Sequence, residues 1–251
     1  MLKRHQDILN LLDKENYISV SKLCETFNVS AVTIRKDLKL LEEKGLVFRS
    51  HGGVSKENPY VKDKNVSEKE QLNVEEKNAI SEAAAQLIKP NDAIMIASGT
   101  TMQMFASAIP INYPLHITTS SLNVALELSK SEQFKILQLG GMLRHSSSSV
   151  TGHFSHQILE NISCNLLFLG VDGIDLSYGL TTTSLEEAML NKKMIASAQK
   201  VIVLTDSSKF NRRGFGKICE FNEVNHIITD KNLGSKIAKD IKSQGIELTL
   251  V

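Results

Sequence analysis

Apolar residues in the first 55 positions recur every three or four residues, which predicts helices with one buried face. Three such segments are expected, at 2–13, 20–27 and 30–44. Ser19 and Ser30 precede the second and third segments as N-cap residues, and Gly45 stands where the third helix should end. Two short extended pieces follow, at 46–50 and 54–55. This order predicts a largely α-helical domain of the winged helix-turn-helix type.

From residue 73 onward the pattern changes to strand-length apolar runs that end in small or acidic residues. These runs lie at 93–98, 115–121, 134–141, 165–173, 200–208 and 226–230. Helices are expected at 75–89, 101–108, 122–129, 184–199 and 234–243. Asn73 and Glu76 have the spacing of a capping box at the start of the first of these helices. The alternation predicts an α/β domain with a mostly parallel sheet.

A charged segment with little apolar periodicity, residues 56–72, separates the two patterns and contains Pro59. Such a composition is typical of a linker or a connecting arm. We therefore expect three parts, which are a winged helix-turn-helix domain at 1–55, a linker at 56–72 and an α/β domain at 73–251.

Composition narrows the class of protein. Hydrophobic residues make up 41% and charged residues 23% of the chain, close to the averages for globular proteins. No run approaches the roughly 20 apolar residues that cross a bilayer, and the first residues do not read as a signal peptide. The three cysteines are widely spaced and form no CxxC pair, which argues against disulfides and a zinc site. We expect a cytoplasmic protein that needs neither metal nor cofactor.

Charge is unevenly divided between the two patterns. Residues 1–56 contain ten Lys and Arg against seven Asp and Glu, whereas residues 57–251 contain 19 against 21. The small basic excess therefore lies at the N-terminus, where a nucleic-acid partner can use it.

Candidates for DNA contact lie on the helix expected at 30–44 and on the following wing. A recognition helix needs an apolar inner stripe and an outer face that reaches phosphates and base edges. The residues that meet this need are Ser30, Thr33, Arg35, Lys36, Lys39, Arg49, His51 and Gly52. A second interpretation stays open, in which the basic face is only solvated and Arg35 pairs with Glu42 or Asp37.

The run SAVTIRKDL at 30–38, followed by LEEKGLVFRSHGG, resembles the signature of the DeoR family of bacterial regulators. The resemblance extends over essentially the whole chain and implies a transcriptional regulator that binds double-stranded DNA. Asp37 matches a position of that signature. Because a carboxylate facing phosphates would be repelled, we expect Asp37 to pair with a cation inside its own domain.

Small polar residues gather where the expected strands of the second domain end. In an open parallel sheet such strand ends share one edge, where ligands bind. The candidate ligand residues are Ser98, Gly99, Thr100, Thr101, Thr119, Ser120, Asp172, Thr182 and Lys209. The plainer interpretation is that many of these residues only cap helices or turns.

This second half resembles the sensor domain of DeoR-type regulators, which is related in fold to ribose-5-phosphate isomerase. The resemblance implies a phosphorylated sugar as effector, with residues 98–101 holding its phosphate and Thr119 and Ser120 assisting. It also implies that Asp172 accepts hydrogen bonds from sugar hydroxyls and that Lys209 supplies a cation. The chain departs from the family pattern at two places, with Ala97 where Asp is usual and Ser120 where Asn is usual.

Residues 144–151 (RHSSSSVT) read as a mobile surface loop that can close over a ligand. Three histidines in and after this loop could suggest a metal, at positions 145, 153 and 156. They have no carboxylates near them in the sequence, and we do not expect a metal site.

The leading hypothesis is a repressor of a carbohydrate-utilisation operon that binds DNA as a dimer or tetramer and responds to a sugar phosphate. An isomerase with a DNA-binding appendage is a second hypothesis. Thr183 and Lys192 stand where the isomerase pattern has catalytic groups, so no catalytic residue is expected, although Glu186 and Glu187 keep the question open. A third hypothesis makes the first 55 residues a protein-interaction module.

Overall fold

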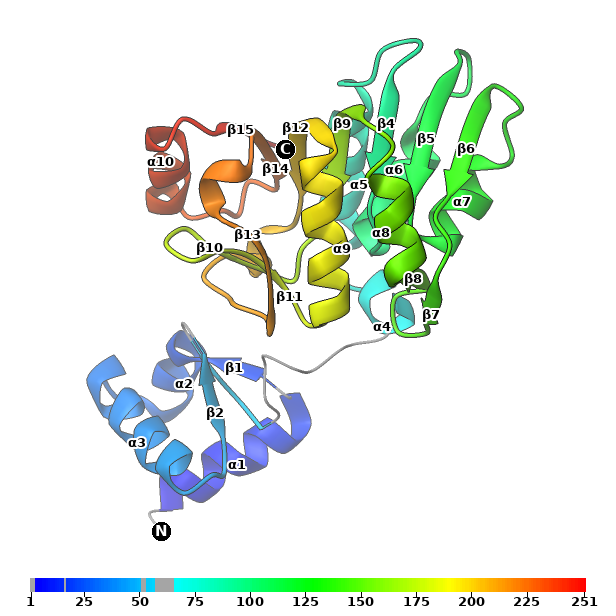
Figure 1. Cartoon of the computed structure of the whole chain (residues 1–251). Coiled ribbons are helices and arrows are strands. Elements are labelled where there is room, and N and C mark those ends of the chain that lie inside the picture. Colours follow the sequence, from blue (N-terminus) through cyan, green and yellow to red (C-terminus); the bar gives the residue numbers. More distant parts are fainter. Residues whose placement is uncertain (1–2, 16, 51–52, 57–65) are drawn as a thin grey trace. The chain divides into compact units, whose positions relative to one another are not determined.

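The computed structural model describes residues 3–15, 17–50, 53–56 and 66–251, which belong to two compact units. The N-terminal unit is Met1–Lys62 and the C-terminal unit is Asp63–Val251 (Figure 1). Among the described helices, none has the length and apolar character needed to cross a membrane.

The N-terminal unit is a winged helix-turn-helix, as the sequence predicts. Its elements are α1 (Lys3–Glu15), β1 (Tyr17–Ser19), α2 (Val20–Phe27), α3 (Ala31–Glu43), β2 (Phe48–Ser50) and β3 (Gly53–Ser55). Ser19 and Ser30 cap α2 and α3 as expected, and Gly45, with φ 68°, follows the end of α3. β1 is the unexpected element, because three residues are too few to show alternation. It pairs with β3 and gives the wing a third antiparallel strand.

Asp37 of α3 joins this helix to α1. Its carboxylate accepts hydrogen bonds from Arg4 Nε at 2.6 Å and from His5 Nε2 at 3.0 Å, and it is almost fully buried. Burial opposes ionisation of Asp37, but the hydrogen bonds from Arg4 and His5 outweigh it and hold the pKa of this carboxyl below its usual value. The expectation that Asp37 pairs within its own domain is confirmed.

The C-terminal unit is an α/β domain around a seven-stranded parallel sheet with the strand order β15-β14-β12-β9-β4-β5-β6. Its strands are β4 (Ala93–Ile96), β5 (Leu115–Thr119), β6 (Phe134–Gln138), β9 (Cys164–Leu169), β12 (Ala198–Leu204), β14 (His226–Thr229) and β15 (Glu247–Leu250). The helices are α4 (Val66–Glu70), α5 (Val74–Ala85), α6 (Thr100–Ala108), α7 (Leu122–Leu128), α8 (His153–Leu159), α9 (Leu185–Ala196) and α10 (Ser235–Ser243). The predicted α/β class is confirmed.

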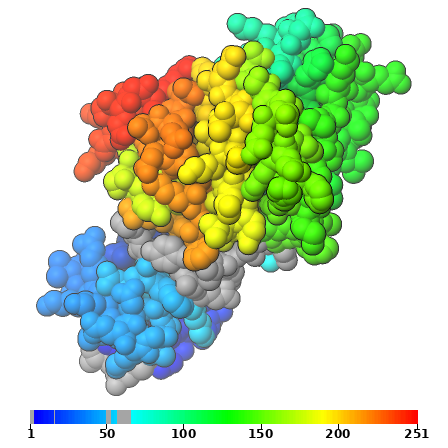
Figure 2. All heavy atoms as spheres, viewed as in Figure 1, coloured from blue at the N-terminus to red at the C-terminus, as the bar shows by residue number. Residues whose placement is uncertain are grey.

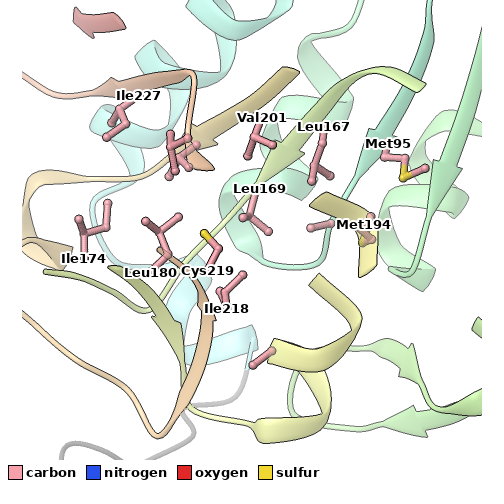
Figure 3. Packing of buried hydrophobic residues seen from close by; sticks show 14 of the residues in the cluster. Met95, Leu167, Leu169, Ile174, Leu180, Met194, Val201, Ile218, Cys219 and Ile227 are labelled. Atoms are coloured by element: carbon pink, nitrogen blue, oxygen red, sulfur yellow. The ribbon is translucent and has the colours of Figure 1, made fainter. Parts of the chain in front are cut away.

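Alternate residues of the central strands face opposite cores, because successive side chains of a strand point to opposite faces. Ile94 and Phe168 belong to the core under α5, α6 and α7, where Phe168 lies 4.3 Å from Phe105 between ring centroids. Met95 and Leu167 belong to the other core, under α8 and α9 (Figure 3). α8 and α9 contact each other and cover the face of the sheet that is turned to the viewer in Figure 2. Both faces of the sheet are therefore covered by helices.

Several local features differ from the sequence-based expectations. The segment 144–151 is not a plain loop, because β7 (Met142–Arg144) and β8 (Ser149–Thr151) form a hairpin in it. A small antiparallel sheet of β10 (Gly173–Asp175), β11 (Gly179–Thr182) and β13 (Gly216–Cys219) was not expected. α4 falls within the segment expected as a linker, of which residues 57–65 lie outside the described residues. Asn73 precedes α5 in the left-handed conformation and makes no side-chain cap.

We expect the substitution Asp37→Asn to loosen α3 from α1, because an amide does not replace a carboxylate that accepts two charge-assisted hydrogen bonds. The free energy of local opening should fall by about 1–3 kcal/mol at neutral pH. Hydrogen–deuterium exchange of α1 and α3 in the full-length chain measures it. Because the pKa of Asp37 in the folded protein lies below its unfolded value of about 4, the ionised carboxylate stabilises the folded protein at pH values above about 4. This stabilisation is lost as the pH falls through the folded-state pKa. The difference between variant and wild type should therefore shrink in acid.

The matched control for this experiment is Glu43→Gln, an exposed position on the same helix. It should leave the exchange of both helices unchanged. Equal exchange of Asp37→Asn and the wild type at neutral pH would show that the contacts of Asp37 do not hold α3.

Candidate functional site

The N-terminus of α3 is organised by two hydroxyl side chains. Ser30 Oγ accepts the N–H of Thr33 at 3.3 Å and lies 3.0 Å from Thr33 Oγ1. Thr33 is half-buried, so its hydroxyl already takes part in the cap. Of the two interpretations of Thr33, this geometry gives direct support to the capping role.

The outer face of α3 carries four exposed side chains at a helical spacing of i, i+3, i+4 and i+7. They are Val32, Arg35, Lys36 and Lys39. Neither Arg35 nor Lys36 has an ion pair with any described residue, so the pairing of Arg35 with Glu42 or Asp37 is not found. Lys39 lies 3.8 Å from Glu43, an exposed contact that a phosphate can readily replace. The face therefore presents cations beside one apolar residue.

Val32 is a residue of this face that the sequence interpretation missed. Its side chain is 63% exposed, and it lies in the first turn of α3. An exposed aliphatic group at the start of a recognition helix can contact the methyl group of thymine. The signal was present in the sequence, because position 32 lies three and four residues before the two exposed cations.

In the wing, Arg49 is attached to α3. Arg49 Nη1 lies 3.3 Å from Glu42 Oε2, and the backbone N–H of Arg49 donates to Glu42 Oε1 at 3.2 Å. Both partners are partly exposed, so the guanidinium stays close to solvent. His51 and Gly52, the other wing candidates, lie outside the described residues.

In the C-terminal unit, the predicted ligand residues follow the carboxyl ends of neighbouring parallel strands. Ser98 follows β4, Thr119 ends β5, Asp172 follows β9 and Lys209 follows β12. Because all these strands are parallel, their carboxyl ends lie along one edge of the sheet. The topology thus brings residues more than 100 positions apart in the sequence to the same edge.

Asp172 is held by three donors. Its Oδ1 accepts Lys69 Nζ at 2.9 Å. Its Oδ2 accepts the hydroxyl of Thr182 at 2.9 Å and the backbone N–H of Thr183 at 3.4 Å. Burial opposes ionisation, but Lys69 and Lys209, together with the hydrogen bonds, hold the pKa of Asp172 well below its usual range. Asp172 is therefore a fixed negative charge at neutral pH.

A second carboxylate, that of Glu187 on α9, lies beside the first. Its Oε1 accepts the hydroxyl of Ser98 at 2.9 Å, and its Oε2 accepts Arg144 Nη1 at 2.5 Å. Thr182 Oγ1 is 3.5 Å from the same Oε2, so one hydroxyl lies between the two carboxylates. Burial and the charge of Asp172 raise the pKa of Glu187, while Arg144 and Ser98 act against the shift.

Lys209 extends the same charge cluster from the sheet edge. Burial lowers the pKa of its ammonium group, although the charges of Asp172 and Asp206 act in the opposite direction. Asp206 itself caps the short 3-10 turn Ser207–Lys209, because its Oδ1 accepts the N–H of Ser208 at 3.0 Å. Asp206 thus has the capping role of the plainer interpretation, and this turn positions Lys209.

The structure brings only some of the predicted ligand residues into this cluster. Ser98, Asp172, Thr182 and Lys209 interact with it through hydrogen bonds or charge. Thr119 and Ser120 are fully buried at the end of β5, and Thr119 Oγ1 accepts the N–H of Ser121 in the turn before α7. These two residues shape that turn.

Residues 99–101 form the turn into α6. Gly99 has φ 125°, a conformation that side chains disfavour, and a Cβ at this position would meet open space. Thr100 is buried and Thr101 is half-buried in the first turn of α6. The turn therefore places the first N–H group of α6 two residues after Ser98, the residue that contacts Glu187.

Sequence interpretation did not identify three charged members of the cluster as binding residues. Lys69 comes from the expected linker, Arg144 from the expected loop, and Glu187 was considered only as a catalytic group. Arg144 was the most accessible of them to prediction, because it begins the serine-rich stretch that was expected to close over a ligand. Nothing in the pattern around Lys69 points to Asp172. Across the described part of the chain, no three His, Cys, Asp or Glu side chains are placed to hold a metal.

The chain is similar to proteins that match it over nearly its whole length, and part of it superposes on solved structures. The chain is 35% identical to an Escherichia coli O157:H7 protein named "Putative aga operon transcriptional repressor", over 99% of this chain and 93% of that protein. It is 32% identical to the lactose phosphotransferase system repressor of Staphylococcus epidermidis, over 91% of this chain and 92% of that one. Ribose 5-phosphate isomerase A of Methanocaldococcus jannaschii superposes with a TM-score of 0.41 and 16% identity, over 55% of each chain.

Two family models match the two units. Residues 4–59 match the DeoR-like helix-turn-helix domain, and residues 72–231 match the DeoR C terminal sensor domain. The relatives named above are transcriptional regulators and cover nearly the whole chain. The chain belongs to the DeoR family of DNA-binding transcriptional regulators.

Proposed function

We propose that this regulator represses a carbohydrate-utilisation operon and is controlled by a phosphorylated sugar bound at the sheet edge of its C-terminal unit. The observation that carries the proposal is the charge cluster there, defined as Lys69, Arg144, Asp172, Glu187 and Lys209. It combines three cations with two carboxylates that are held by hydroxyl and amide donors. Cations donate charge-assisted hydrogen bonds to a phosphate group, and an ionised carboxylate accepts hydrogen bonds from sugar hydroxyls.

The names of the relatives support a sugar as effector. One of them is named for a lactose phosphotransferase system, that is, for a carbohydrate and for the transfer of a phosphoryl group. A phosphorylated sugar presents both chemical features that the charge cluster can recognise, an anion and several hydroxyls. Within this proposal, residues 98–101 and Lys209 bind the phosphate, and Asp172 with Thr182 binds the sugar.

Glu187 does not favour an isomerase. A general base needs a carboxylate oxygen within reach of the substrate proton. Here Ser98 and Arg144 occupy the two oxygens of Glu187, with Arg144 at 2.5 Å. We therefore assign Glu187 the role of positioning Arg144 and Ser98, and we propose binding without turnover. Steady conversion of a sugar phosphate by the purified protein would reject this assignment.

For DNA recognition, we propose that the outer face of α3 enters the major groove, with Arg35, Lys36 and Lys39 as contacts and Val32 beside them. Ser30, Thr33 and Arg49 then hold the helix start and the wing in position, and His51 and Gly52 are proposed as further DNA contacts. One such face reads few base pairs, so two copies of the chain are needed for a selective operator. The proposal thus includes a homo-oligomer, a dimer or tetramer, acting in the cytoplasm, with residues 56–72 as the connection between the DNA-binding and sensing parts.

We expect Lys36→Ala to weaken binding to the regulator's own upstream DNA. If Lys36 contacts a base edge, discrimination at one position should fall by about 1–3 kcal/mol; if it contacts a phosphate, binding to all sequences should weaken and the salt slope should fall by about 1. Binding titrations at several salt concentrations distinguish these outcomes. Lys44→Ala, an exposed position after the end of α3, is the matched control. Unchanged affinity and salt slope for Lys36→Ala would remove this face of α3 from the interface.

We expect Lys209→Met to weaken binding of the effector about 10- to 100-fold, because a charge-assisted hydrogen bond to a phosphate contributes about 1.5–3 kcal/mol. Calorimetric titration with glucose 6-phosphate, galactose 6-phosphate, fructose 1-phosphate and ribose 5-phosphate measures this. Exposed Lys231 provides the matched control, Lys231→Met. Absence of binding of all four compounds to the wild-type protein at millimolar concentration would count against a sugar phosphate as effector.

A further inference from the structure

The short helix α4 is the first described element after residues 57–65, the segment that follows the DNA-binding domain in the sequence. It contributes Lys69 to the charge cluster, where Lys69 Nζ lies 2.9 Å from Asp172 Oδ1. The two side chains are 25% and 21% exposed, so the ion pair is shielded from solvent but still reachable by a ligand. The contact joins residues 103 positions apart.

Polar contacts hold α4 in place, and none of its five residues is buried. The backbone N–H of Val66 donates to the carbonyl of Ser146 at 2.9 Å, in the turn of the β7–β8 hairpin that carries Arg144. At the other end, the ammonium group of Lys77 donates to the carbonyls of Lys69 and Leu72, both at 2.5 Å. A helix with no fully buried residue gains little from the hydrophobic effect, so a change in its polar contacts can move it at low cost.

The hydrogen bonds of Asp172 make a sugar compete with α4. Lys69 occupies Oδ1, while Thr182 and Thr183 occupy Oδ2. A sugar hydroxyl that donates to this carboxylate must replace one of these donors or share its oxygen. Thr182 and Thr183 belong to β11 and its continuation, whereas Lys69 extends from a helix without buried residues. Lys69 is therefore the donor that gives way most easily.

A phosphate group should also separate Lys69 from Asp172. The charge cluster has three cations for two carboxylates, so an added dianion changes which cation pairs with which anion. The ammonium group of Lys69 can then leave Asp172 for a phosphate oxygen. Either event changes the position of the Lys69 ammonium group and removes a contact that holds the end of α4.

We propose that Lys69 is an effector-site residue. When a ligand binds, Lys69 exchanges its partner Asp172 for the ligand, and this exchange moves α4. The movement transmits the occupancy of the site to the connection with the DNA-binding domain. The proposal rests on the proposed function, because it takes the charge cluster as the effector site. It adds a residue for that site and a physical route by which the site can act on DNA binding.

The first test needs no ligand. The substitutions Lys69→Met and Asp172→Asn break the same ion pair, so each should shift the DNA affinity of the full-length protein in the same direction, by about fivefold or more. The double variant should shift it no further than the larger single effect, because the pair is already broken. Glu68→Gln, exposed on the same helix, is the matched control and should leave the affinity unchanged.

Two results of this first test would overturn the proposal. One is unchanged DNA affinity in both single variants. The other is additive effects in the double variant, which would mean that the two residues act on DNA binding separately. Thermal unfolding of each variant identifies misfolded protein, and Lys69→Arg, which keeps the charge, should retain the wild-type affinity.

The second test uses the four sugar phosphates named above. A compound that shifts the DNA affinity of the wild-type protein should still bind Lys69→Met, but the shift should fall to less than about twofold. A full shift in Lys69→Met would overturn the route through α4. If none of the four compounds binds the wild-type protein, the proposed effector class fails, and the ligand-free double-variant test still decides the role of Lys69.

Discussion

The parallel pairing of the seven central strands is the constraint on which the sensing part of the molecule depends. Parallel strands send all their carboxyl ends to one edge, and ligands of open α/β sheets bind there. Ser98, Asp172 and Lys209 meet for this reason, although they come from three separate parts of the sequence. Helices cover both faces of the sheet, so the polar and charged side chains of the site lie at this edge.

The two carboxylates of the charge cluster are stable at this edge because each accepts hydrogen bonds from several donors. An ionised group that leaves water without partners costs several kcal/mol, so Asp172 and Glu187 can stay buried only with the donors around them. In the proposed effector site, a ligand that displaces one of these donors changes the partners of another charge. The strands of the cluster are fixed by the sheet, whereas α4 has no buried residue. A change of partners should therefore move α4 more readily than the strands.

Local signals in the sequence predicted most of the helices and the main strands. Ser19 and Ser30 predicted where two helices begin, and the apolar runs predicted the parallel sheet. The same signals failed where the determining contact is distant in sequence. No periodicity links Lys69 to Asp172 or Arg144 to Glu187, because these pairs exist only once the sheet has formed. The short strands β1, β7 and β8 were missed because three residues carry too little pattern.

The hydroxyl of Thr182 has one proton and two carboxylate neighbours, at 2.9 Å from Asp172 and 3.5 Å from Glu187. A single proton can be donated to only one of them at a time. When a ligand donates a hydrogen bond to one carboxylate, the Thr182 hydroxyl can rotate by about 120° around its Cβ–Oγ1 bond and donate to the other carboxylate. Binding at one carboxylate then changes the hydrogen bonds of the other. In the proposed site, this hydroxyl therefore links the carboxylate that binds the sugar, Asp172, to the Arg144–Glu187 pair.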